Sequence, residues 1–393
     1  MRLVYRKSLL LILLSTLFLA SSIVSCSWRV VNNPFEESSG GGKTPAKIEA
    51  DKTISLPEEA NTAGEAILPA TIEKRPIALA IAGDVMFDSY IYNWIASEGV
   101  DYPWTDVAHL FKEADIAAVN FESSSSLRGS STKPEGYGFR SPPHTLMGMV
   151  NSGINYVSIG NNHVLDYGSE AFEDTLEILN DLGIAFSGAG MNYSQAQEMA
   201  SIDVEGTTIG FLSYTAIIPA ITWLPGDASP GVAPLYSESD IHLALENITR
   251  SKNYCDVLIV IPHWGIEYAS TPTWTQQLLA HAMIDAGADM IIGGHPHVLQ
   301  GVEFYQNKPI FYSLGNFIFL KMNDEAGKSA VFQILLDKDG FISCFVHPVF
   351  IDSCKANLLQ EDDLYYTDIL QQFAKLCGDL GTSVTNNKIV RPE

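Results

Sequence analysis

Five short apolar runs, each ending abruptly in polar residues, constrain the fold of this chain more than any other feature of its 393 residues. The runs occupy 77–82, 114–119, 154–159, 256–261 and 290–292. Continuous apolar runs of this length are typical of strands that are buried on both faces. The sequence therefore predicts a sheet that other layers cover on both sides.

Stretches with apolar residues three and four positions apart lie between these runs, at 107–114, 171–182, 241–248 and 274–286. This spacing predicts helices, and the alternation of strands with helices places the chain in the α/β class. Other strands are expected to pair through hairpins that turn near 205–206, 307–308 and 338–340. Two mixed sheets packed face to face, with helices outside, accommodate both kinds of connection.

The polar residues that end the runs form a chemically consistent set. Its members are Asp84, Glu122, Asn162, His163, His263, His295 and His297. In open α/β sheets, ligand sites collect beyond the carboxyl ends of the strands, so we expect these side chains to meet. Carboxylate, amide and imidazole ligands together suit Mn, Fe, Zn or Co, and not the all-oxygen preference of Ca²⁺. The set predicts a site for one or two divalent metal ions.

Two of these histidines, His295 and His297, flank Pro296. In extended backbone this spacing directs both rings to the same face, and the proline disfavours helix. Taken alone, the pair is also compatible with a structural His-Pro-His turn. With the other four strand ends included, a metal site is the favoured interpretation.

The motifs at these strand ends resemble those of a known family, the bacterial capsule synthesis proteins of the CapA type. They are Gly83-Asp84, Asn120-Phe121-Glu122, Gly160-Asn161-Asn162-His163, His263-Trp264-Gly265 and Gly294-His295-Pro296-His297. Segments 136–140 and 312–317 also match, and the resemblance covers roughly residues 76–320. The family is implicated in poly-γ-glutamate production and resembles calcineurin-like metallophosphoesterases. The resemblance implies a four-layer α/β/β/α sandwich with a metal site at the rim of its two sheets.

The resemblance also implies a distribution of metal ligands. Asp84 and His297 would bind a first metal ion, and Glu122 would bridge it to a second. The second ion would be bound by Asn162, His263 and His295. Phosphoesterases usually open with Asp-x-His, whereas here Asp84 is followed by Val85-Met86, and the bridging Glu122 replaces a shorter aspartate. The first metal set therefore has fewer ligands, and phosphatase activity does not follow from the resemblance.

Four further residues receive expected roles near the metal site. His163 would act as a catalytic acid or base outside the ligand set, with Asp166 orienting its ring. An exposed loop aspartate is the alternative for Asp166. Arg140 could bind a substrate carboxylate or phosphate, or could be a surface arginine without a ligand. Glu267 follows His263 closely and could support the ligands from outside.

Three functions are compatible with these residues. The first is a metal-dependent hydrolase or transferase acting on an anionic polymer, with poly-γ-glutamate as the substrate that the resemblance implies. The second is a non-catalytic accessory lipoprotein that binds or escorts the polymer during export. The third is a phosphodiesterase of cell-envelope substrates. Because no synthetase-like module is visible, polymerisation would lie with partner synthase or export subunits.

The charge of the chain excludes one class of partner. Lys and Arg number 23 against 46 Asp and Glu, and no basic block is present, so a nucleic-acid groove is excluded. Outside the cytoplasm four cysteines could form disulfides, although free buried thiols are equally compatible. These are Cys255, Cys344, Cys354 and Cys377.

The two ends of the chain are expected to lie outside the folded core. Basic residues precede an apolar run at 9–20, and Ile23-Val24-Ser25-Cys26 resembles a bacterial lipobox. We therefore predict a lipoprotein signal peptide at 1–25 and lipidation at Cys26, with an ordinary signal peptide as the alternative. A tether at 26–75 would hold a domain at 76–350 outside the cytoplasm, anchored to the membrane. Residues 351–393 lack strand-like runs and predict a helical extension, with its helix at 364–376, and a polar tail.

Overall fold

Strand β1 (Ile77–Val85) shows how the sequence builds the core. Its residues alternate between two apolar clusters, with Leu79 and Ile81 in one and Ala80 and Ala82 in the other. Both faces of the strand are therefore buried, as its continuous apolar run predicts. The computed structural model describes residues 75–391. The predicted signal peptide, Cys26 and all but the last residue of the predicted tether lie outside the described residues.

The larger of the two main sheets has ten strands. In spatial order they are β19 (Val384–Thr385), β20 (Lys388–Val390), β17 (Gly340–Asp352), β16 (Lys328–Asp337), β1, β2 (Ile116–Phe121), β5 (Tyr156–Ser158) and β6 (Ala185–Ser187). Off this path, β15 (Asn316–Ile318) pairs with β1, and β18 (Lys355–Leu358) pairs with β17. The sheet is mixed, because β1, β2, β5 and β6 run parallel whereas β16 runs antiparallel to β1.

The second sheet has six strands and is also mixed. Their order is β13 (Val302–Tyr305), β14 (Lys308–Phe311), β12 (Met290–Ile292), β11 (Val257–His263), β9 (Thr207–Thr215) and β8 (Ala200–Val204). The two edge strands pair antiparallel with their neighbours through the predicted hairpins. Two short pairs lie apart from the main sheets, β3 (Ser124–Ser125) with β4 (Arg140–Ser141), and β7 (Ala189–Gly190) with β10 (Gly231–Val232).

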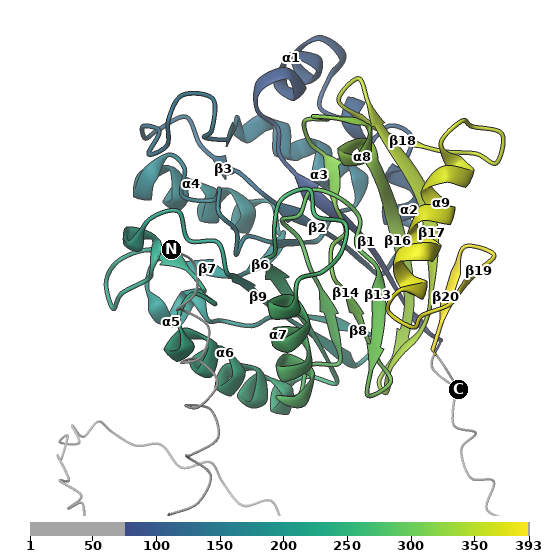
Figure 1. The fold of residues 1–393 in the computed structure, drawn as a ribbon. Coiled ribbons are helices and arrows are strands. Elements are labelled where there is room, and N and C mark those ends of the chain that lie inside the picture. The colour runs from purple at the N-terminus through teal and green to yellow at the C-terminus, as the bar shows by residue number, and fades with distance from the viewer. Residues whose placement is uncertain (1–74, 392–393) are drawn as a thin grey trace, which may run out of the picture. The chain divides into compact units, whose positions relative to one another are not determined.

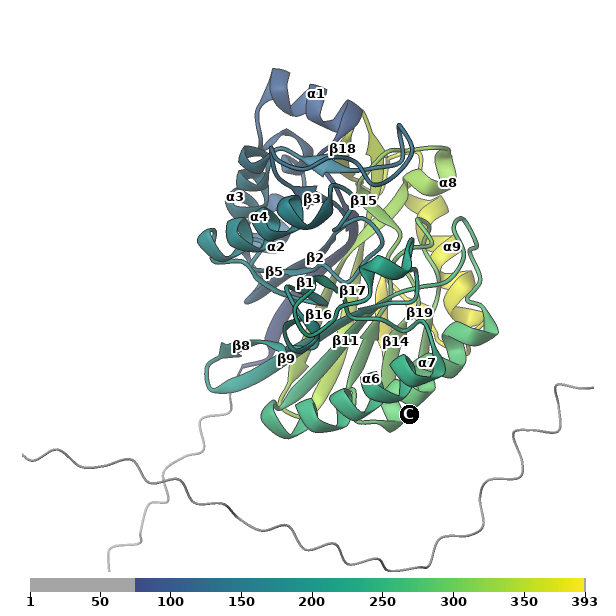
Figure 2. The same ribbon diagram turned by 90° about the vertical axis from the view of Figure 1, so that its left-hand side faces the viewer.

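Helices cover the outer face of each sheet (Figure 2). On the larger sheet these are α1 (Ser89–Glu98), α2 (Ala108–Lys112), α3 (Met147–Ser152) and α4 (Gly168–Asp181). On the smaller sheet they are α6 (Glu238–Ser251) and α7 (Trp274–Asp285), and both begin with capping boxes. Short helices α5 (Tyr193–Ala196) and α8 (Asp324–Gly327) lie in connections. The predicted helices at 107–114, 171–182, 241–248 and 274–286 are confirmed.

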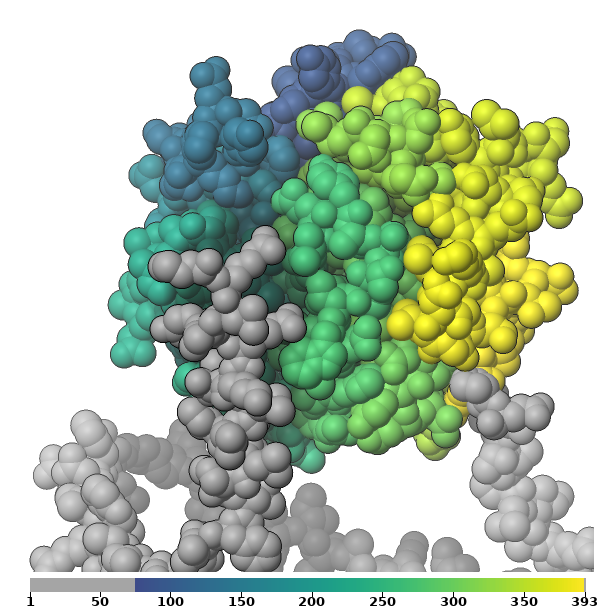
Figure 3. Space-filling model, viewed as in Figure 1, coloured from purple at the N-terminus to yellow at the C-terminus, as the bar shows by residue number. Residues whose placement is uncertain are grey.

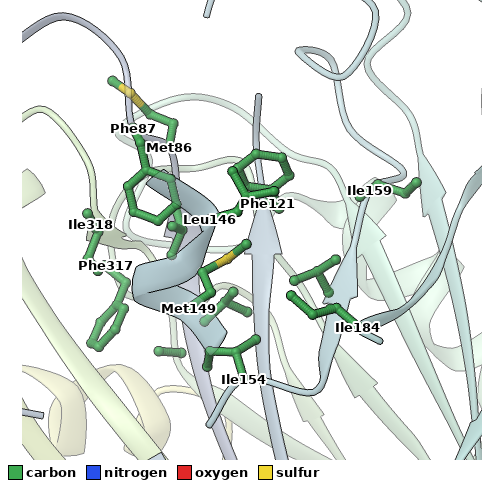
Figure 4. Close-up of a cluster of buried hydrophobic side chains, with 14 of the residues drawn as sticks. Met86, Phe87, Phe121, Leu146, Met149, Ile154, Ile159, Ile184, Phe317 and Ile318 are labelled. Carbon is green, nitrogen blue, oxygen red and sulfur yellow. The ribbon is translucent and has the colours of Figure 1, made fainter. Parts of the chain in front are cut away.

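Three apolar clusters separate four layers. One lies between helices α1–α4 and the larger sheet, where Phe87, Phe121 and Met149 meet (Figure 4). A second joins the two sheets, and a third joins the smaller sheet to α6 and α7. The predicted α/β/β/α sandwich of two mixed sheets is confirmed by this layering.

The C-terminal segment packs against this core and forms one side of the folded unit, shown in yellow (Figures 1 and 3). Helix α9 (Tyr366–Gly378) matches the predicted helix and inserts Ile369 and Phe373 into the cluster between the sheets. The sequence does not predict the short strands β18, β19 and β20, which extend the larger sheet. All four cysteines in the described part of the chain are free. None of the helices within 75–391 is both long and apolar enough to cross a membrane.

Candidate metal centre

The predicted ligands lie where the carboxyl ends of strands from both sheets meet. Asp84 is the penultimate residue of β1, Glu122 follows β2, and Asn162 follows β5 in the larger sheet. His263 ends β11, and His295 follows β12 in the smaller sheet. The two sheets approach closely here, because a Cβ placed on Gly294 would lie 3.0 Å from Asp84 Oδ1 and 3.4 Å from His263 Nδ1. Side chains from separate strands therefore converge at one rim.

The structure brings five of these residues into two overlapping sets. One set is Asp84, Glu122 and His297, and the other is Glu122, His263 and His295. Within each set, one donor atom from every residue lies within 4.8 Å of the others. Glu122 Oε1 lies 3.4 Å from His263 Nε2 and 4.0 Å from His297 Nε2. The carboxylate of Glu122 is therefore shared, as expected for a bridging position.

Asn120 holds the two carboxylates in place. Its amide nitrogen donates to Asp84 Oδ1 over 2.8 Å and to Glu122 Oε2 over 3.3 Å. Its carbonyl oxygen accepts from Ser158 and Asn161. The second oxygen of each carboxylate does not bond to Asn120 and is therefore available to the space between the two ligand sets. Asn120 belongs to a quoted motif, yet sequence reasoning gave it no role.

Two more amides orient the histidine rings. Asn162 Oδ1 lies 2.7 Å from His263 Nε2, so Asn162 stands beside the second set. Asn316 Oδ1 lies 2.9 Å from His297 Nδ1, and Asp84 Oδ2 lies 3.2 Å from the same nitrogen. A proton on Nδ1 satisfies Asn316 Oδ1 and leaves Nε2 of His297 as the nitrogen available to a metal, while Asp84 Oδ2 is buried without a hydrogen-bond partner. Sequence reasoning missed Asn316, although the matching segment 312–317 contains it.

Burial sets the charge of each candidate ligand. Burial raises the pKa of Glu122 to about 8, and the charge of Asp84 adds to the effect. Burial lowers the pKa of His263 to about 3 and of His295 to about 2, so both imidazoles are neutral at pH 7. Burial opposes the charged form of His297, but the carboxylates of Glu122 and Asp84 outweigh it and raise its pKa to about 9. For Asp84, the contacts with His297 outweigh burial and lower the pKa.

This donor set fits a divalent cation. Among the described residues, Glu122 Oε1 and His295 Nδ1 are buried without a hydrogen-bond partner. Buried polar atoms are normally paired, because an unpaired one costs about 1–3 kcal/mol. A bound cation would satisfy both atoms and would favour the ionised form of Glu122. The neutral imidazoles of His263 and His295 and the two carboxylates are of the ligand types that Mn, Fe, Zn and Co accept.

The His-Pro-His segment reaches the site in an unexpected conformation. His295 has φ 93° and His297 has φ 58°, so the expectation of extended backbone is wrong. The segment turns sharply after Gly293, and the carbonyl of Pro296 accepts from Tyr268 N over 2.7 Å. The two rings still lie 5.8 Å apart on the same side of the turn. Left-handed backbone at two non-glycine residues stores strain, which is common at functional sites.

His163 and Asp166 form a buried pair beside the second set. His163 Nδ1 lies 2.6 Å from Asp166 Oδ2, and His163 Nε2 lies 3.8 Å from Glu122 Oε1. Asp166 is fully buried and also accepts from Phe139 N, which excludes an exposed loop aspartate. The ring of Phe139 stacks on His163 at 4.2 Å between centroids. Lys133, which sequence reasoning missed, lies 2.8 Å from Asp166 Oδ1.

Comparison with known proteins places this geometry in a family. The family described as "Bacterial capsule synthesis protein PGA_cap" matches residues 78–321, which contain both ligand sets. The chain belongs to this family. It is 30% identical to the PGA biosynthesis protein CapA of Bacillus subtilis over 317 residues, which cover 80% of this chain and 82% of that protein. It is 29% identical to the capsule biosynthesis protein CapA of Bacillus anthracis, covering 73% of this chain and 71% of that protein.

A more distant relative and a solved structure also match. A probable polyglutamine synthesis accessory protein of Mycobacterium tuberculosis is 24% identical over 225 residues, which cover 55% of this chain and 59% of that protein. The NAD nucleotidase NadN of Haemophilus influenzae aligns with a TM-score of 0.42 and 13% identity. This alignment covers 76% of this chain and 62% of that protein.

Not every residue that the sequence predicted for the site of this capsule synthesis protein lies at the candidate metal centre. The Arg140 guanidinium lies 4.2 Å over the ring of Tyr167 and donates to Arg128 O, and neither contact involves a member of the two ligand sets. Exposed Glu267, in contrast, has a carboxylate oxygen within 4.8 Å of His295 and His297 donor atoms. Met86, two residues after Asp84, packs into the apolar cluster under the helices. The first set therefore receives no ligand from that position.

Proposed function

We propose that this chain is an extracytoplasmic, metal-dependent protein of poly-γ-glutamate capsule synthesis that hydrolyses or transfers an anionic polymer. The sharing of Glu122 between two ligand sets carries the proposal, because such a carboxylate can hold two ions side by side. Family membership and the names of the Bacillus relatives supply the substrate class. The two centres would take Mn, Fe, Zn or Co.

Asp84, Glu122 and His297 would hold one ion, and His263, His295, Asn162 and the same Glu122 would hold the other. When bound, a divalent ion polarises the scissile carbonyl and lowers the pKa of a water molecule. Asn120 keeps both carboxylates turned toward the ions. Asn316 keeps His297 Nδ1 occupied, which reserves Nε2 for coordination.

His163 is placed to move a proton at the reacting group. Asp166 fixes the ring through Nδ1, and Nε2 faces the shared carboxylate at 3.8 Å. At that distance it can give a proton to a leaving group or take one from an attacking water, without being a ligand. Phe139 stacks on the His163 ring and Phe319 on the His297 ring, and these contacts hold both imidazole planes in place.

A hydrolysis assay with measured metal content tests this proposal. The metal-loaded chain should cleave poly-γ-glutamate, and a strong chelator should abolish the cleavage. His295→Ala removes a buried donor of the second set, so it should lose metal and turnover together. His242→Ala is the matched control, because the His242 side chain is 73% exposed and its ion pair is with Glu246. The control should keep both properties.

Cleavage of a generic phosphodiester without cleavage of the polymer would replace this proposal with the phosphodiesterase function. The same result from chelated and metal-loaded protein would contradict metal-dependent chemistry altogether.

The small number of ligands in the first set favours a second candidate function. Asp84, Glu122 and His297 provide three donors, and Met86 points into the core instead of providing a fourth. With one well-held ion, the chain would bind or escort the polymer during export without cleaving it. Tight polymer binding with no turnover at full metal loading would select this function.

We also propose that lipidation at Cys26 anchors the chain to the membrane and that partner synthase or export subunits make and move the polymer. The lipobox-like sequence before Cys26 supports the anchor.

A further inference from the structure

A cleft of about 660 Å³ opens beside the proposed metal centre, on the side of His163. Residues from segments 132–137 and 217–223 line it, together with Asn162, His163 and Glu267. Its volume falls within the range of about 300–1,000 Å³ that is usual for ligand sites. A substrate whose reacting group lies at the metal centre would extend into this cleft.

Lys133 is the only lysine or arginine among the described residues that line the cleft. Its side chain is 14% exposed, and its Nζ lies 5.7 Å over the ring of Trp223, another lining residue. The ammonium donates to Asn162 O over 2.7 Å and forms an ion pair with Asp166 Oδ1 at 2.8 Å. A cation held by two fixed acceptors at the edge of a cleft is well positioned to recognise an anion.

The third N–H of Lys133 has no acceptor among the described residues. An ammonium has three donors and no acceptor. The bond to Asn162 O uses one of them, and the ion pair with Asp166 Oδ1 takes up a second at most. The remaining neighbour, His163 Nδ1, lies 3.0 Å away. That nitrogen is also 2.6 Å from Asp166 Oδ2, and an ionised carboxylate only accepts, so Nδ1 carries the proton there and cannot accept from Lys133. One donor of a mostly buried cation is therefore left for a ligand.

We propose that Lys133 is the specificity-determining residue of this cleft and that its free N–H binds one carboxylate of the substrate next to the reacting unit. The inference rests on the proposed function and adds the subsite by which a carboxylate-bearing chain is distinguished from a neutral one. The rest of the lining suits the alkyl and amide parts of such a chain. Trp223, Ile217, Pro219 and Tyr137 offer apolar surface, and Thr222 offers a hydroxyl group.

Paired binding measurements test this subsite. The metal-loaded full chain is titrated with poly-γ-glutamate and with its neutral methyl ester, and metal content is measured for each variant. Lys133→Met should weaken binding of poly-γ-glutamate by about tenfold or more, the usual effect of losing a charged hydrogen bond. The same variant should leave binding of the methyl ester unchanged, and Lys133→Arg should restore most of the affinity for the acid. Lys338→Met, in an exposed hairpin, is the control and should change neither.

Lys133→Met leaves the buried Asp166 carboxylate without its cation, which can destabilise the fold. A second variant therefore distinguishes a loss of binding from misfolding. Lys133→Met combined with Asp166→Asn removes both charges and should show the same selective loss. Equal weakening of the acid and the ester, or loss of metal, would show that Lys133 only positions its neighbours and would overturn the inference. Unchanged binding of the acid by both variants would also overturn it while leaving the proposed function intact. If the unaltered chain binds neither polymer, the proposed function fails and the inference fails with it.

Discussion

At the scale of single residues, the buried carboxylate of Glu122 lowers the stability of the metal-free fold. Its pKa is about 8 in the folded metal-free chain because burial and the neighbouring charge of Asp84 favour the neutral form. An unfolded glutamate titrates near 4.3. Between these two pH values the folded state takes up a proton that the unfolded state does not, so this group makes the folded state less stable as pH rises through that window.

Glu122→Gln should therefore stabilise the metal-free chain at pH 8 and destabilise the metal-loaded chain relative to the unaltered protein. The amide carries no charge to desolvate, but it also cannot bridge two cations. Thermal unfolding with and without metal measures both effects. A variant that unfolds earlier than the unaltered protein in both states would contradict this explanation.

Substitution of His163 distinguishes a loss of catalysis from a loss of metal binding. His163→Asn removes the proton-transfer group and leaves the Lys133–Asp166 ion pair in place. Metal content should be retained, while turnover should fall by about 10²–10⁴-fold, the usual contribution of general acid–base catalysis. Mass spectrometry of bound metal and a polymer-cleavage assay provide the two readouts, with His242→Asn as the exposed control. Loss of metal in His163→Asn would make the residue a ligand instead.

At the scale of elements, the site depends on how closely β1 passes the segment before β15. A Cβ on Gly83 would lie 1.8 Å from Gly315 O, which also accepts the N–H of Asp84 over 2.9 Å. Gly83→Ala should therefore cost about 3 kcal/mol or more, since overpacking against backbone cannot relax by a rotamer change. Gly378→Ala, at the end of α9, meets no atom within 4 Å and should be neutral or slightly stabilising. Similar urea unfolding curves for the two variants would contradict the close approach.

The same elements show why part of the site could be predicted. Asp84, Glu122 and His263 lie at or directly after strands whose continuous apolar runs are visible in the sequence. The carboxyl ends of neighbouring parallel strands must meet, so their convergence follows from the pattern. The four layers follow for the same reason, because each run requires cover on both faces.

Other contacts have no local signal. Lys133 lies in a loop rich in Ser, Gly and Pro and meets His163 across 30 residues of sequence. The backbone at His295 and His297 is left-handed because of a turn that spacing alone does not reveal. Strands β18–β20 are two to four residues long, and the edge of the larger sheet, not an apolar run, determines their pairing.

At the scale of the whole molecule, the chain carries a net charge of −23, which disfavours approach of a polyanion. For the proposed anionic substrate, local positive charge would come from the proposed cations and from Lys133 at the cleft. The proposed anchor would add a second constraint, because it would hold the chain near the membrane.

Cys26→Ala tests the anchor. The variant should lose fatty-acid labelling and membrane association, because the thiol is the expected lipidation site. Residues 75–391 contain the whole described core, so the released protein should keep its unfolding temperature. Metabolic labelling followed by fractionation measures the first effect. Unchanged labelling of Cys26→Ala would refute the lipoprotein prediction.

The central claim is that two unequal ligand sets share Glu122, and stepwise chelation with metal analysis tests it most directly. The account predicts two ions per chain at saturation, with one released at low chelator concentration and the other retained until much higher concentration. The first ion should come from Asp84, Glu122 and His297, since Met86 packs into the core, whereas Asn162 lies beside the second set as a further donor. His297→Ala should accordingly remove only the weakly held ion. A chain that binds no metal at saturation, or two ions that leave together, would contradict the account.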